Sequence, residues 1–539
     1  MKSVAAGPAR EPDLGAAPRR RTARAASGRD AAWPLAVVLG ATALVLLANR
    51  DGLHAWFAAD DFLWLELGTL DDVLRSFVGP WGHGALWRPL SRVSFYLDLR
   101  LFGRNAGLWH LESLLWHAAT TTLLVLLLAR TTGDRAFALA TGAIFALLPM
   151  QRENTLWISA RSHPVALSGA LGSLLLVDRF LDAPSAGRLL ASCGLLAAAL
   201  LTYEAPVYTV PLAVLLVAAR GRPIPWRRGG TAIVALSSVA VAYVVLRRLV
   251  LRGANLYVPH APGWYLSPAF AARLGEVATD VLGQIRPSPW WFVAAALAGA
   301  VVAPRTLLLL AAGLVVAVVG YLPFSVVDGF GPRFAYATQT GLAMMLAAAL
   351  TGLARVPRLG GPCAAVLLAA LLVNELHETQ QIAREWREAG ALGRETLERL
   401  TAAWPDPDPD RPALILGVPA SHGRALLFFT YFDLALGTFH PAYAGFRLPG
   451  HVLSDFDAKL SHAIAIDTWR REQERRQRHG LPPLVCAQGD PARTKTVDGF
   501  VQAMLDCDAT FYTMDRNLAV RKLTRPLVEA RLARGWRNR

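Results

Sequence analysis

The sequence predicts an all-α polytopic membrane protein with about eleven transmembrane helices, followed by a small C-terminal α/β domain outside the cytoplasm. The chain has 539 residues, 54% of them hydrophobic, and a mean hydropathy of +0.34, which is too apolar for one soluble core of that length. Apolar runs of spanning or near-spanning length recur between residues 34 and 376. Beyond them, short apolar stretches alternate with charged ones, as in a small soluble domain.

Residues 1–32 are rich in Arg, Ala, Pro and Gly and lack periodic apolar positions, so we expect a disordered, basic cytoplasmic tail. The first apolar run, 34–47, follows these basic residues. A cleaved signal peptide is one interpretation of it. We favour an uncleaved first span, because the later topology needs an N-terminus inside the cell.

The transmembrane domain, 33–376, contains ten further apolar runs, and a large outer loop, 50–107, separates the first run from the second. This loop is too apolar and aromatic to be free in solvent, so we expect short helices lying along the membrane interface. The ten runs lie near 109–129, 136–150, 164–181, 188–202, 205–219, 230–250, 290–303, 305–325, 335–353 and 361–376.

The charges favour an N-terminus inside the cell. The five loops that then face the cytoplasm are short and positive, as the positive-inside rule requires. One group departs from the rule: Arg247, Arg248 and Arg252 end the seventh span on the outer side. Either the span count slips there or these arginines act outside. The cytoplasmic loops carry Arg130, Arg135, Arg188, Arg220, Arg222, Arg227, Arg228, Arg305, Arg355 and Arg358.

This topology also explains the net charge of +15, much of which lies in the tail and the short inner loops. Such a pattern excludes nucleic acid as a partner. We therefore predict a multi-pass protein of the cell membrane with a cytoplasmic N-terminus. The odd number of spans places the C-terminal domain outside the cytoplasm.

Residues 377–410 join the membrane domain to the soluble one. The stretch 378–403 predicts an amphipathic helix, and Pro405 to Asp410 alternates Pro and Asp, as in an extended linker. The soluble extracytoplasmic domain, 411–539, contains two expected buried strands, "ALILGVP" and "PLVCAQG", and a charged helix from Asp467 to Arg478. The apolar positions of the amphipathic helix are Ile382, Trp386, Ala389, Leu392 and Leu397.

The four cysteines divide by location. Cys193 and Cys363 lie within apolar runs, where we expect them to be packing residues. Cys486 and Cys507 lie in the soluble domain, and outside the cytoplasm they are candidates for a disulfide. The alternative is two free buried thiols.

Two adjacent carboxylates, Asp60 and Asp61, follow the first span. Adjacent helical residues point about 100° apart, so the two side chains cannot both face one point. One is a candidate general base, while the other orients it or helps to hold a cation. The alternative is that the pair caps the helix that begins at Phe62.

Three other outer segments carry charges at the ends of spans. In "LPMQRENTLWISARSH", residues 148–163, Glu153, Trp157 and Arg161 share one face if the segment is helical. A carboxylate between two closely spaced spans, as in "LLTYEAP", is costly unless it faces a wet cavity. Four such segments on one membrane face indicate a binding or reaction chamber. The remaining candidates are Arg88, Tyr203, Glu204, Arg333 and Tyr336.

The stretch 87–130 resembles the transmembrane O-mannosyltransferase family that usually carries C-terminal tetratricopeptide repeats, which like the protein O-mannosyltransferases belongs to the GT-C glycosyltransferases. The resemblance covers roughly residues 34–375. The matching residues are Asp60, Asp61, Trp87 to Leu90, Gly103, Asn105, His110, Pro149, Glu153, Trp157, Ile158, Arg161, Glu204, Arg333 and Tyr336.

The departures concern the same motifs. Two histidines of the family are replaced by Leu148 and Gln151, and the lysine of its Lys-Glu pair by Tyr203. A glycine and an aspartate that flank the matching arginine are Ala160 and His163 here. The C-terminal repeats are absent from this sequence. These changes affect the expected sugar and acceptor more than the fold.

The resemblance implies an integral membrane glycosyltransferase with a GT-C-like fold. It would transfer a sugar, mannose in the resembled family, from a polyprenyl-phosphate-linked donor to a hydroxyl of a protein, glycan or lipid on the outer face. No cofactor is certain, and a divalent metal stays open because related families differ in that need. Membrane lipids would surround the spans.

The expected roles follow from the chemistry of this donor. Asp60 is the expected catalytic base, with Asp61 second. Arg161 and Arg333 are expected to bind the phosphate, because arginine pairs with phosphate through two parallel hydrogen bonds. The other binding candidates, which would orient the sugar or the arginines, are Glu153, Glu204, Tyr203, Tyr336 and Arg88.

Two other classes of protein use similar features. A transporter of an anionic solute or envelope precursor would use the same chamber, but the halves show no repeat symmetry and the outer loop is large for a gate. A membrane-anchored scaffold would have its function in residues 411–539 and would make the acid pair incidental.

Overall fold

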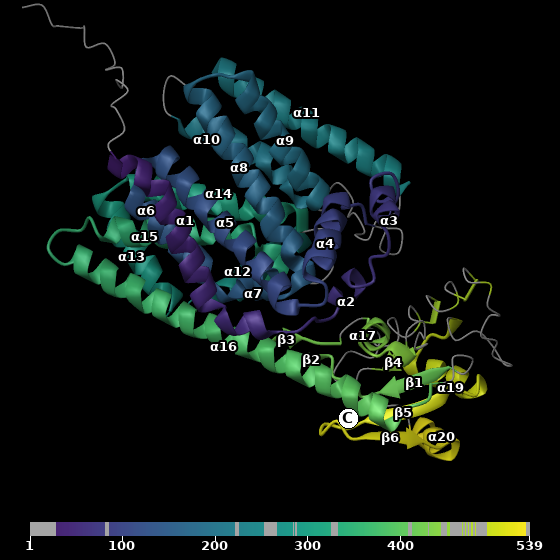
Figure 1. Ribbon diagram of the computed structural model, residues 1–539. Coiled ribbons are helices and arrows are strands. Elements are labelled where there is room, and N and C mark those ends of the chain that lie inside the picture. The colour runs from purple at the N-terminus through teal and green to yellow at the C-terminus, as the bar shows by residue number, and fades with distance from the viewer. Residues whose placement is uncertain are drawn as a thin grey trace, which may run out of the picture.

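The computed structural model describes residues 28–80, 86–220, 226–252, 267–283, 288–324, 332–407, 412–428, 431–443, 450–452 and 493–534, with a few isolated positions between these ranges. The fold is a large helical bundle that carries a small α/β domain at one end (Figure 1). This confirms the predicted fold class. Most of the expected basic tail, residues 1–27, lies outside the described residues.

The bundle contains the apolar helices that the sequence predicts, in the predicted order. Among the described residues, five helices are long and apolar enough to cross a membrane, and six shorter apolar helices accompany them. They are α1 (Gly28–Ala48), α5 (Ala106–Thr132), α6 (Arg135–Leu147), α8 (Ser162–Asp182), α9 (Ala186–Thr202), η4 with α10 (Ala205–Tyr208 and Thr209–Ala219), α11 (Trp226–Leu251), α13 (Pro289–Val302), α14 (Arg305–Tyr321), α15 (Thr338–Leu353) and α16 (Gly360–Ala403). One further helix, α12 (Pro268–Gly283), was not predicted.

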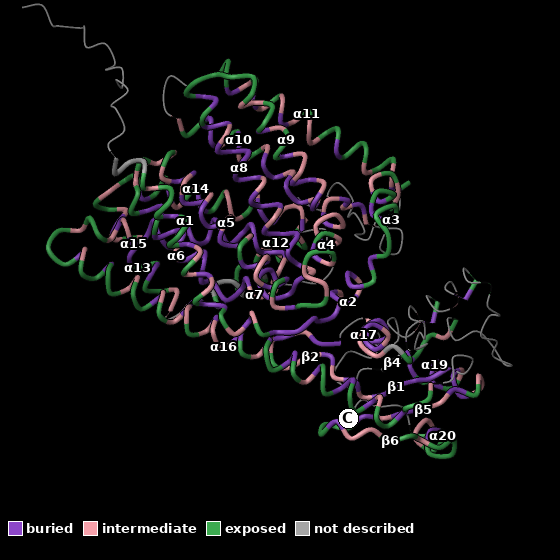
Figure 2. The backbone as a smooth tube through the Cα atoms, viewed as in Figure 1, coloured by how far each residue is buried: buried purple, intermediate pink, exposed green. Residues whose placement is uncertain are grey.

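Helices at the rim of the bundle expose apolar side chains, as lipid-facing helices do. Leu249 on α11 and Leu308 on α14 are 67% and 72% exposed. Figure 2 shows α11 largely exposed, whereas α8 and α5 are buried inside. In the interior, α14 and α15 meet at Gly313 and Gly341, where an added Cβ would collide with the facing backbone. Small residues allow such close helix contacts in membrane proteins.

The arginines of the predicted inner loops gather at one end of the bundle. Arg130 of α5 and Arg220 after α10 both pair with Asp178 and Asp182 of α8. Arg355 pairs with Asp134 at 2.9 Å. The loops predicted to share one membrane face therefore lie together. Asp178 is fully buried between the two arginines, so these charges also join helix ends.

The first outer loop folds into short helices, as predicted. The Pro at the first position of α4 removes an N–H that would have no helical partner, and a capping box between Thr69 and Asp72 starts α3. The helices are η1 (Arg50–His54), α2 (Asp61–Trp64), α3 (Leu70–Arg75) and α4 (Pro89–Phe102).

The last span and the predicted amphipathic helix form one helix, α16, of 44 residues. The helix predicted over 378–403 is present, but it continues the last span without a break. No Gly or Pro interrupts the chain between the two parts, so nothing ends the helix there. Figure 1 shows α16 running along the bundle and on to the C-terminal domain. Four of its predicted apolar positions, Ile382, Trp386, Ala389 and Leu397, are buried, and Leu392 is half-buried.

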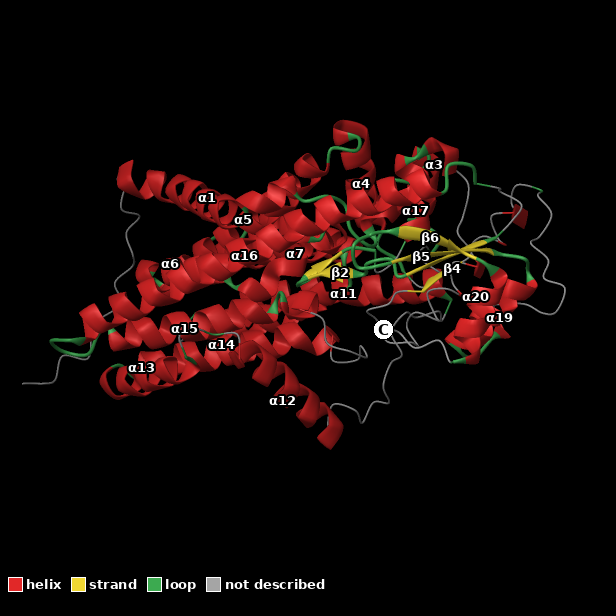
Figure 3. Cartoon of the chain, turned by 90° about the horizontal axis from the view of Figure 1, so that it is seen from below, coloured by secondary structure: helices red, strands yellow, loops and turns green. Residues whose placement is uncertain are grey.

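The C-terminal domain is built on a four-stranded sheet of order β4-β1-β5-β6, at one end of the molecule (Figure 3). The central strand β1 is parallel to β4 and β5, and β6 is antiparallel to β5. The strands are β1 (Ala413–Leu416), β4 (Gly450–Val452), β5 (Thr510–Met514) and β6 (Val520–Leu523); β2 (Ser421–His422) and β3 (Ala425–Leu426) form a hairpin, and the helices are α17 (Phe432–Phe439), α19 (Val497–Asp506) and α20 (Arg525–Ala533).

Residues of β1 alternate between two cores, because successive strand side chains point to opposite faces. Leu414 and Leu416 pack with α19 and α20. Ala413 and Ile415 pack in the core that also contains residues of the first outer loop and the end of α16. The predicted strand "ALILGVP" is present over its first four residues, and its second face ties the domain to the bundle. The other expected strand, "PLVCAQG", and most of the expected helix from Asp467 to Arg478 lie outside the described residues.

Candidate functional site

The segment 153–163, which we call the hub segment, lies where the predicted outer loops meet. Glu153, Trp157 and Arg161 were expected to share one face if this segment is helical. Instead the helix α7 (Arg152–Leu156) ends before Trp157, whose backbone is extended, and the short helix η3 (Ile158–Arg161) follows. The segment is not one helix, so the condition for a shared face is not met. The hub segment sends side chains in different directions, and each reaches a different cluster.

Asp61 binds the hub segment. Its carboxylate accepts hydrogen bonds from the backbone N–H and the hydroxyl of Ser159, at 2.8 and 2.6 Å, and from the N–H of Ala58 at 3.0 Å. Asp61 is 1% exposed. Burial raises the pKa of this carboxyl to about 7, although these hydrogen bonds oppose the rise.

Asp60 lies in different surroundings. It is half-buried and stands at the N-cap position of α2 without a capping hydrogen bond from its side chain. The alternative in which the pair caps this helix is therefore not supported. The residue before it, Ala59, has a φ of 49°, a left-handed conformation that costs a non-glycine residue about 1 kcal/mol. Strain of this kind is often found at functional sites.

Arg161 points into a buried cluster of acids. Its guanidinium pairs with Asp98 of α4 and, at 3.1 Å, with Glu112 of α5. It also lies 4.6 Å above the ring of Phe95 and is 1% exposed. Both prongs of the arginine thus face carboxylates, which does not support the expected contact with a donor phosphate.

Arg333 is the more accessible of the two expected phosphate ligands. It pairs with Glu153 at 3.0 Å, and its side chain is 33% exposed. The guanidinium lies 5.1 Å from the ring centre of Trp157 and 4.6 Å from that of Phe334. Its carbonyl accepts a hydrogen bond from Asn154. The structure therefore brings Glu153, Trp157 and Arg333 together.

Arg88 and Glu204 form a third cluster. The guanidinium holds both carboxylate oxygens, at 2.8 and 2.6 Å, and stacks 4.1 Å above the ring of Tyr203. Burial alone would raise the pKa of Glu204, but the Arg88 ion pair outweighs it and lowers that pKa. An ion pair thus stabilises the carboxylate that the sequence placed between two spans. Arg247, from the group that departs from the positive-inside rule, also lies close to Glu204.

His163 links this third cluster to the hub segment. Its ring lies 4.2 Å from that of Tyr203 and 6.3 Å from that of Phe334, beside Arg333. The residue that replaces the expected aspartate therefore contributes an aromatic contact. In this way the hub segment contacts the acid pair, the Arg161 cluster, Arg333 and the Arg88 cluster.

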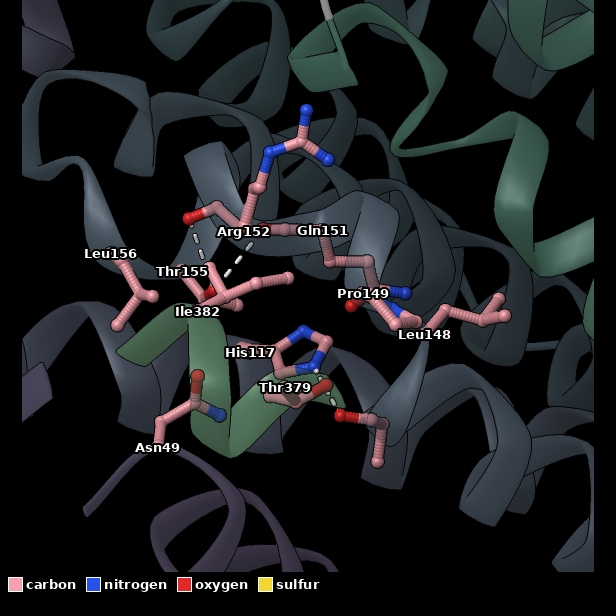
Figure 4. A pocket seen from close by; sticks show the side chains of 11 residues that line it. Asn49, His117, Leu148, Pro149, Gln151, Arg152, Thr155, Leu156, Thr379 and Ile382 are labelled. Atoms are coloured by element: carbon pink, nitrogen blue, oxygen red, sulfur yellow. Dashed lines mark hydrogen bonds between the residues drawn. The ribbon is translucent and has the colours of Figure 1, made fainter. Parts of the chain in front are cut away.

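The side chain of Tyr336 does not join this group. It is 1% exposed, and its hydroxyl lies 2.7 Å from Nδ1 of His117. His117 lines a small polar cavity with Asn49, Gln151 and Thr379, shown in Figure 4. The cavity has a free volume of about 10 Å³, which is room for one water molecule. It is too small for a sugar.

Several residues of the site were not expected. Ser159 gave no signal in the sequence, since a serine in a polar loop is common. Glu112 gave one, because a carboxylate in an apolar span needs a partner. Within the described part of the chain, no three His, Cys, Asp or Glu residues gather as a metal-binding group.

No protein-family model matches the chain, and no curated protein matches it. Solved structures that match include two of ArnT from Cupriavidus metallidurans. The one bound to undecaprenyl phosphate is 14% identical with a TM-score of 0.46, over 90% of this chain and 93% of that chain. The apo structure is 14% identical with a TM-score of 0.47, over 91% and 94%. These values describe a loose likeness in the path of the chain, which assigns neither donor nor acceptor.

Proposed function

We propose that this protein is a membrane glycosyltransferase of the GT-C type. It transfers a sugar, with mannose as the first candidate, from a polyprenyl-phosphate-linked donor to an acceptor hydroxyl on the outer face of the membrane. The observation that carries this proposal is the hub segment. It binds the buried Asp61, next to the half-buried Asp60, and it meets three arginine-carboxylate clusters at one end of a bundle whose rim helices are apolar.

Each part of this arrangement suits one part of the reaction. The lipid tail of the donor needs apolar helices, the phosphate needs cations, and the acceptor hydroxyl needs a base. In the transfer step the acceptor oxygen bonds to the anomeric carbon, and the bond from that carbon to the phosphate oxygen breaks. The acceptor proton goes to the base, and polyprenyl phosphate leaves.

We assign the base to Asp60, because it is the accessible member of the pair. Asp61 then fixes the turn against Ser159 and keeps Asp60 in place. Arg333 is the proposed phosphate ligand, and Arg88 or Arg247 is the second. Arg161 is reassigned from phosphate binding to positioning, since it is almost fully buried and its guanidinium faces two carboxylates, whereas Arg88 is partly exposed.

The remaining candidates keep supporting roles in this proposal. Glu153 and Glu204 orient the arginines with which they pair, and the ring of Tyr203 packs against the guanidinium of Arg88. Tyr336 is buried away from the chamber, so we propose that it packs the bundle rather than binding substrate.

Asp60→Asn tests the assignment of the base. Loss of a general base typically lowers the rate by ~10²–10⁴, while insertion into the membrane and yield should stay near those of the wild type. The measurement is transfer from radiolabelled polyprenyl-phosphate sugars by the purified protein in detergent or liposomes. Asp51→Asn is the matched control, because Asp51 lies in the same loop and pairs with Arg387 of α16.

Full activity of a folded Asp60→Asn variant would contradict this assignment. Loss of transfer in Asp61→Asn alone would exchange the roles of the two acids but keep the mechanism. Accumulation of an anionic solute by wild-type liposomes, without transfer, would favour a transporter instead.

A further inference from the structure

We propose that Phe439 of the C-terminal domain is a positioning residue for the acid-pair turn, which we define as residues 56–62. The proposal rests on the proposed function, in which Asp60 of this turn is the base. It gives the C-terminal domain a part in the reaction, whereas the sequence left the function of that domain open.

Phe439 is the last residue of α17, and its ring contacts the turn on both sides of the acids. Its centroid lies 4.8 Å from that of Trp56, 6.3 Å from that of Phe57 and 6.4 Å from that of Phe62. Asp60 and Asp61 lie between these residues in the chain. One ring of the C-terminal domain therefore touches both ends of the turn that presents the base.

Two other residues of the domain hold the middle of the turn. The carbonyl of Leu427 accepts a hydrogen bond from the N–H of Ala59 at 2.7 Å. The ring of Phe428 stacks on Phe62 at 5.8 Å. Ala59 is the residue with the left-handed backbone, and such a conformation persists only where its surroundings hold it. The C-terminal domain supplies this support.

The turn is fixed from its other side by α16. Gly390 and Gly393 of this helix lie against Trp56, so closely that a Cβ at Gly390 would collide with the Trp56 backbone. Trp56 is thus held between α16 and the ring of Phe439. Removing that ring leaves a gap on one side of Trp56, into which the turn can relax.

The expected effect is on turnover rather than on donor binding, because Phe439 contacts neither Arg333 nor Arg88 in any contact that the described residues show. A displacement of about 1 Å at a catalytic group can lower the rate by about 10²-fold. Phe439→Ala should therefore lower kcat and leave the KM for the donor nearly unchanged. Phe439→Leu should recover most of kcat, because it fills much of the same space.

The matched control is Phe500→Ala. Phe500 is a buried ring of the C-terminal domain, whereas Phe439 is half-buried, and Phe500 packs with Leu414 on the other face of the sheet. The variants are compared by transfer kinetics and by hydrogen–deuterium exchange of the peptide that covers residues 55–64. We expect faster exchange at the amide of Ala59 in Phe439→Ala, with wild-type exchange in Phe500→Ala.

Wild-type kcat and wild-type exchange in Phe439→Ala would overturn the proposal. Equal losses in Phe439→Ala and Phe500→Ala would overturn it too, because they would show general loss of the domain. If Phe439→Ala does not fold, Phe439→Val is compared with Phe500→Val by the same two measurements, because valine is smaller than leucine and still leaves a gap beside Trp56. Asp60→Asn run alongside separates the two proposals. An active Asp60→Asn variant would contradict the assignment of Asp60 as the base. An inactive Asp60→Asn variant together with a fully active Phe439→Ala variant would contradict only the positioning role of Phe439.

Discussion

At the scale of the residue, burial separates two acids that are neighbours in the sequence. Three hydrogen-bond donors occupy the carboxylate of Asp61, and its side chain has no path to solvent. Asp60 stands at the edge of the same turn and is half-buried. Asp60 is therefore the more exposed member of the pair. For this reason we assign Asp60 as the base and Asp61 as the residue that holds the turn in place.

The same contrast in burial separates Arg161, which is buried, from Arg333, which is one-third exposed. We predict that Arg161→Lys lowers stability by roughly 3 kcal/mol, because one ammonium group cannot replace a two-pronged contact with the buried Asp98 and the partly exposed Glu112. Arg333→Lys should leave stability nearly unchanged and raise the KM for the donor, because Arg333 is one-third exposed and pairs with one acid, Glu153, among the described residues. Thermal unfolding in detergent, measured beside donor KM and kcat, distinguishes the two effects.

Each variant serves as the control for the other. A stable Arg161→Lys protein with a raised donor KM would return Arg161 to the phosphate site. Unchanged kinetics in Arg333→Lys would remove Arg333 from that site and leave Arg88 or Arg247 as the ligand.

The sequence could predict these residues as a group but not their pairing. Most candidates lie in the hub segment or contact it or one of its partners, and Tyr336 does so only through its backbone N–H, which donates to the carbonyl of Arg333. The partners of Arg161, Asp98 and Glu112, come from two other helices, 63 and 49 positions earlier in the chain. No local sequence pattern indicates with which of several outer acids an arginine will form an ion pair. The break at Trp157 was equally hidden, because no Gly or Pro marks it.

At the scale of the element, hydropathy predicted the spans well because it depends only on local composition. The helix α16 shows the limit of that approach. Its first part is apolar and its second part amphipathic, so the two were expected to be separate. The backbone continues through this change, and contacts with η1, β2 and β3 bury one face of the second part. Arg424, between the two strands of the hairpin, also pairs with Glu378 and Glu385 of α16.

Ion pairs join the helix ends at the opposite side of the bundle. We predict that Asp178→Asn lowers stability by roughly 3 kcal/mol, because it leaves Arg130 and Arg220 without their buried partner. Asp182→Asn is the control and should cost under about 1 kcal/mol, since Asp182 is half exposed and binds the same arginines. Thermal unfolding of both variants in detergent tests this. Equal shifts in unfolding temperature for the two variants would show that the burial of Asp178 does not increase its contribution to stability.

At the scale of the whole molecule, the outer loops, the end of α16 and the C-terminal sheet share one apolar core. The domain is therefore not a separate module on a linker. Sequence composition could predict a small α/β domain, but not this contact, because aromatic residues such as Phe62, Phe428 and Phe439 look alike whether they pack within a domain or between two.

The shared core makes the side of the membrane on which the domain lies a test of the whole interpretation. We predict that the C-terminus is outside the cytoplasm and that Cys507 pairs with Cys486. Cys507 is disulfide-bonded in the structure, and Cys486 lies outside the described residues. A reporter fused after Arg539 tests the side. Alkylation mass spectrometry with and without reductant tests the bond, with Cys193 and Cys363 as unpaired controls.

A cytoplasmic signal from the reporter would place the acid pair inside as well, because Phe439 and Leu427 hold the turn to the domain. The arginine-rich loops joined by Asp178 would then face outward, against the positive-inside rule. The chamber would open to the cytoplasm, and an acceptor on the outer face would be excluded. An outside C-terminus with the disulfide formed instead places the base, the arginines and the C-terminal domain on the side where the proposed transfer takes place.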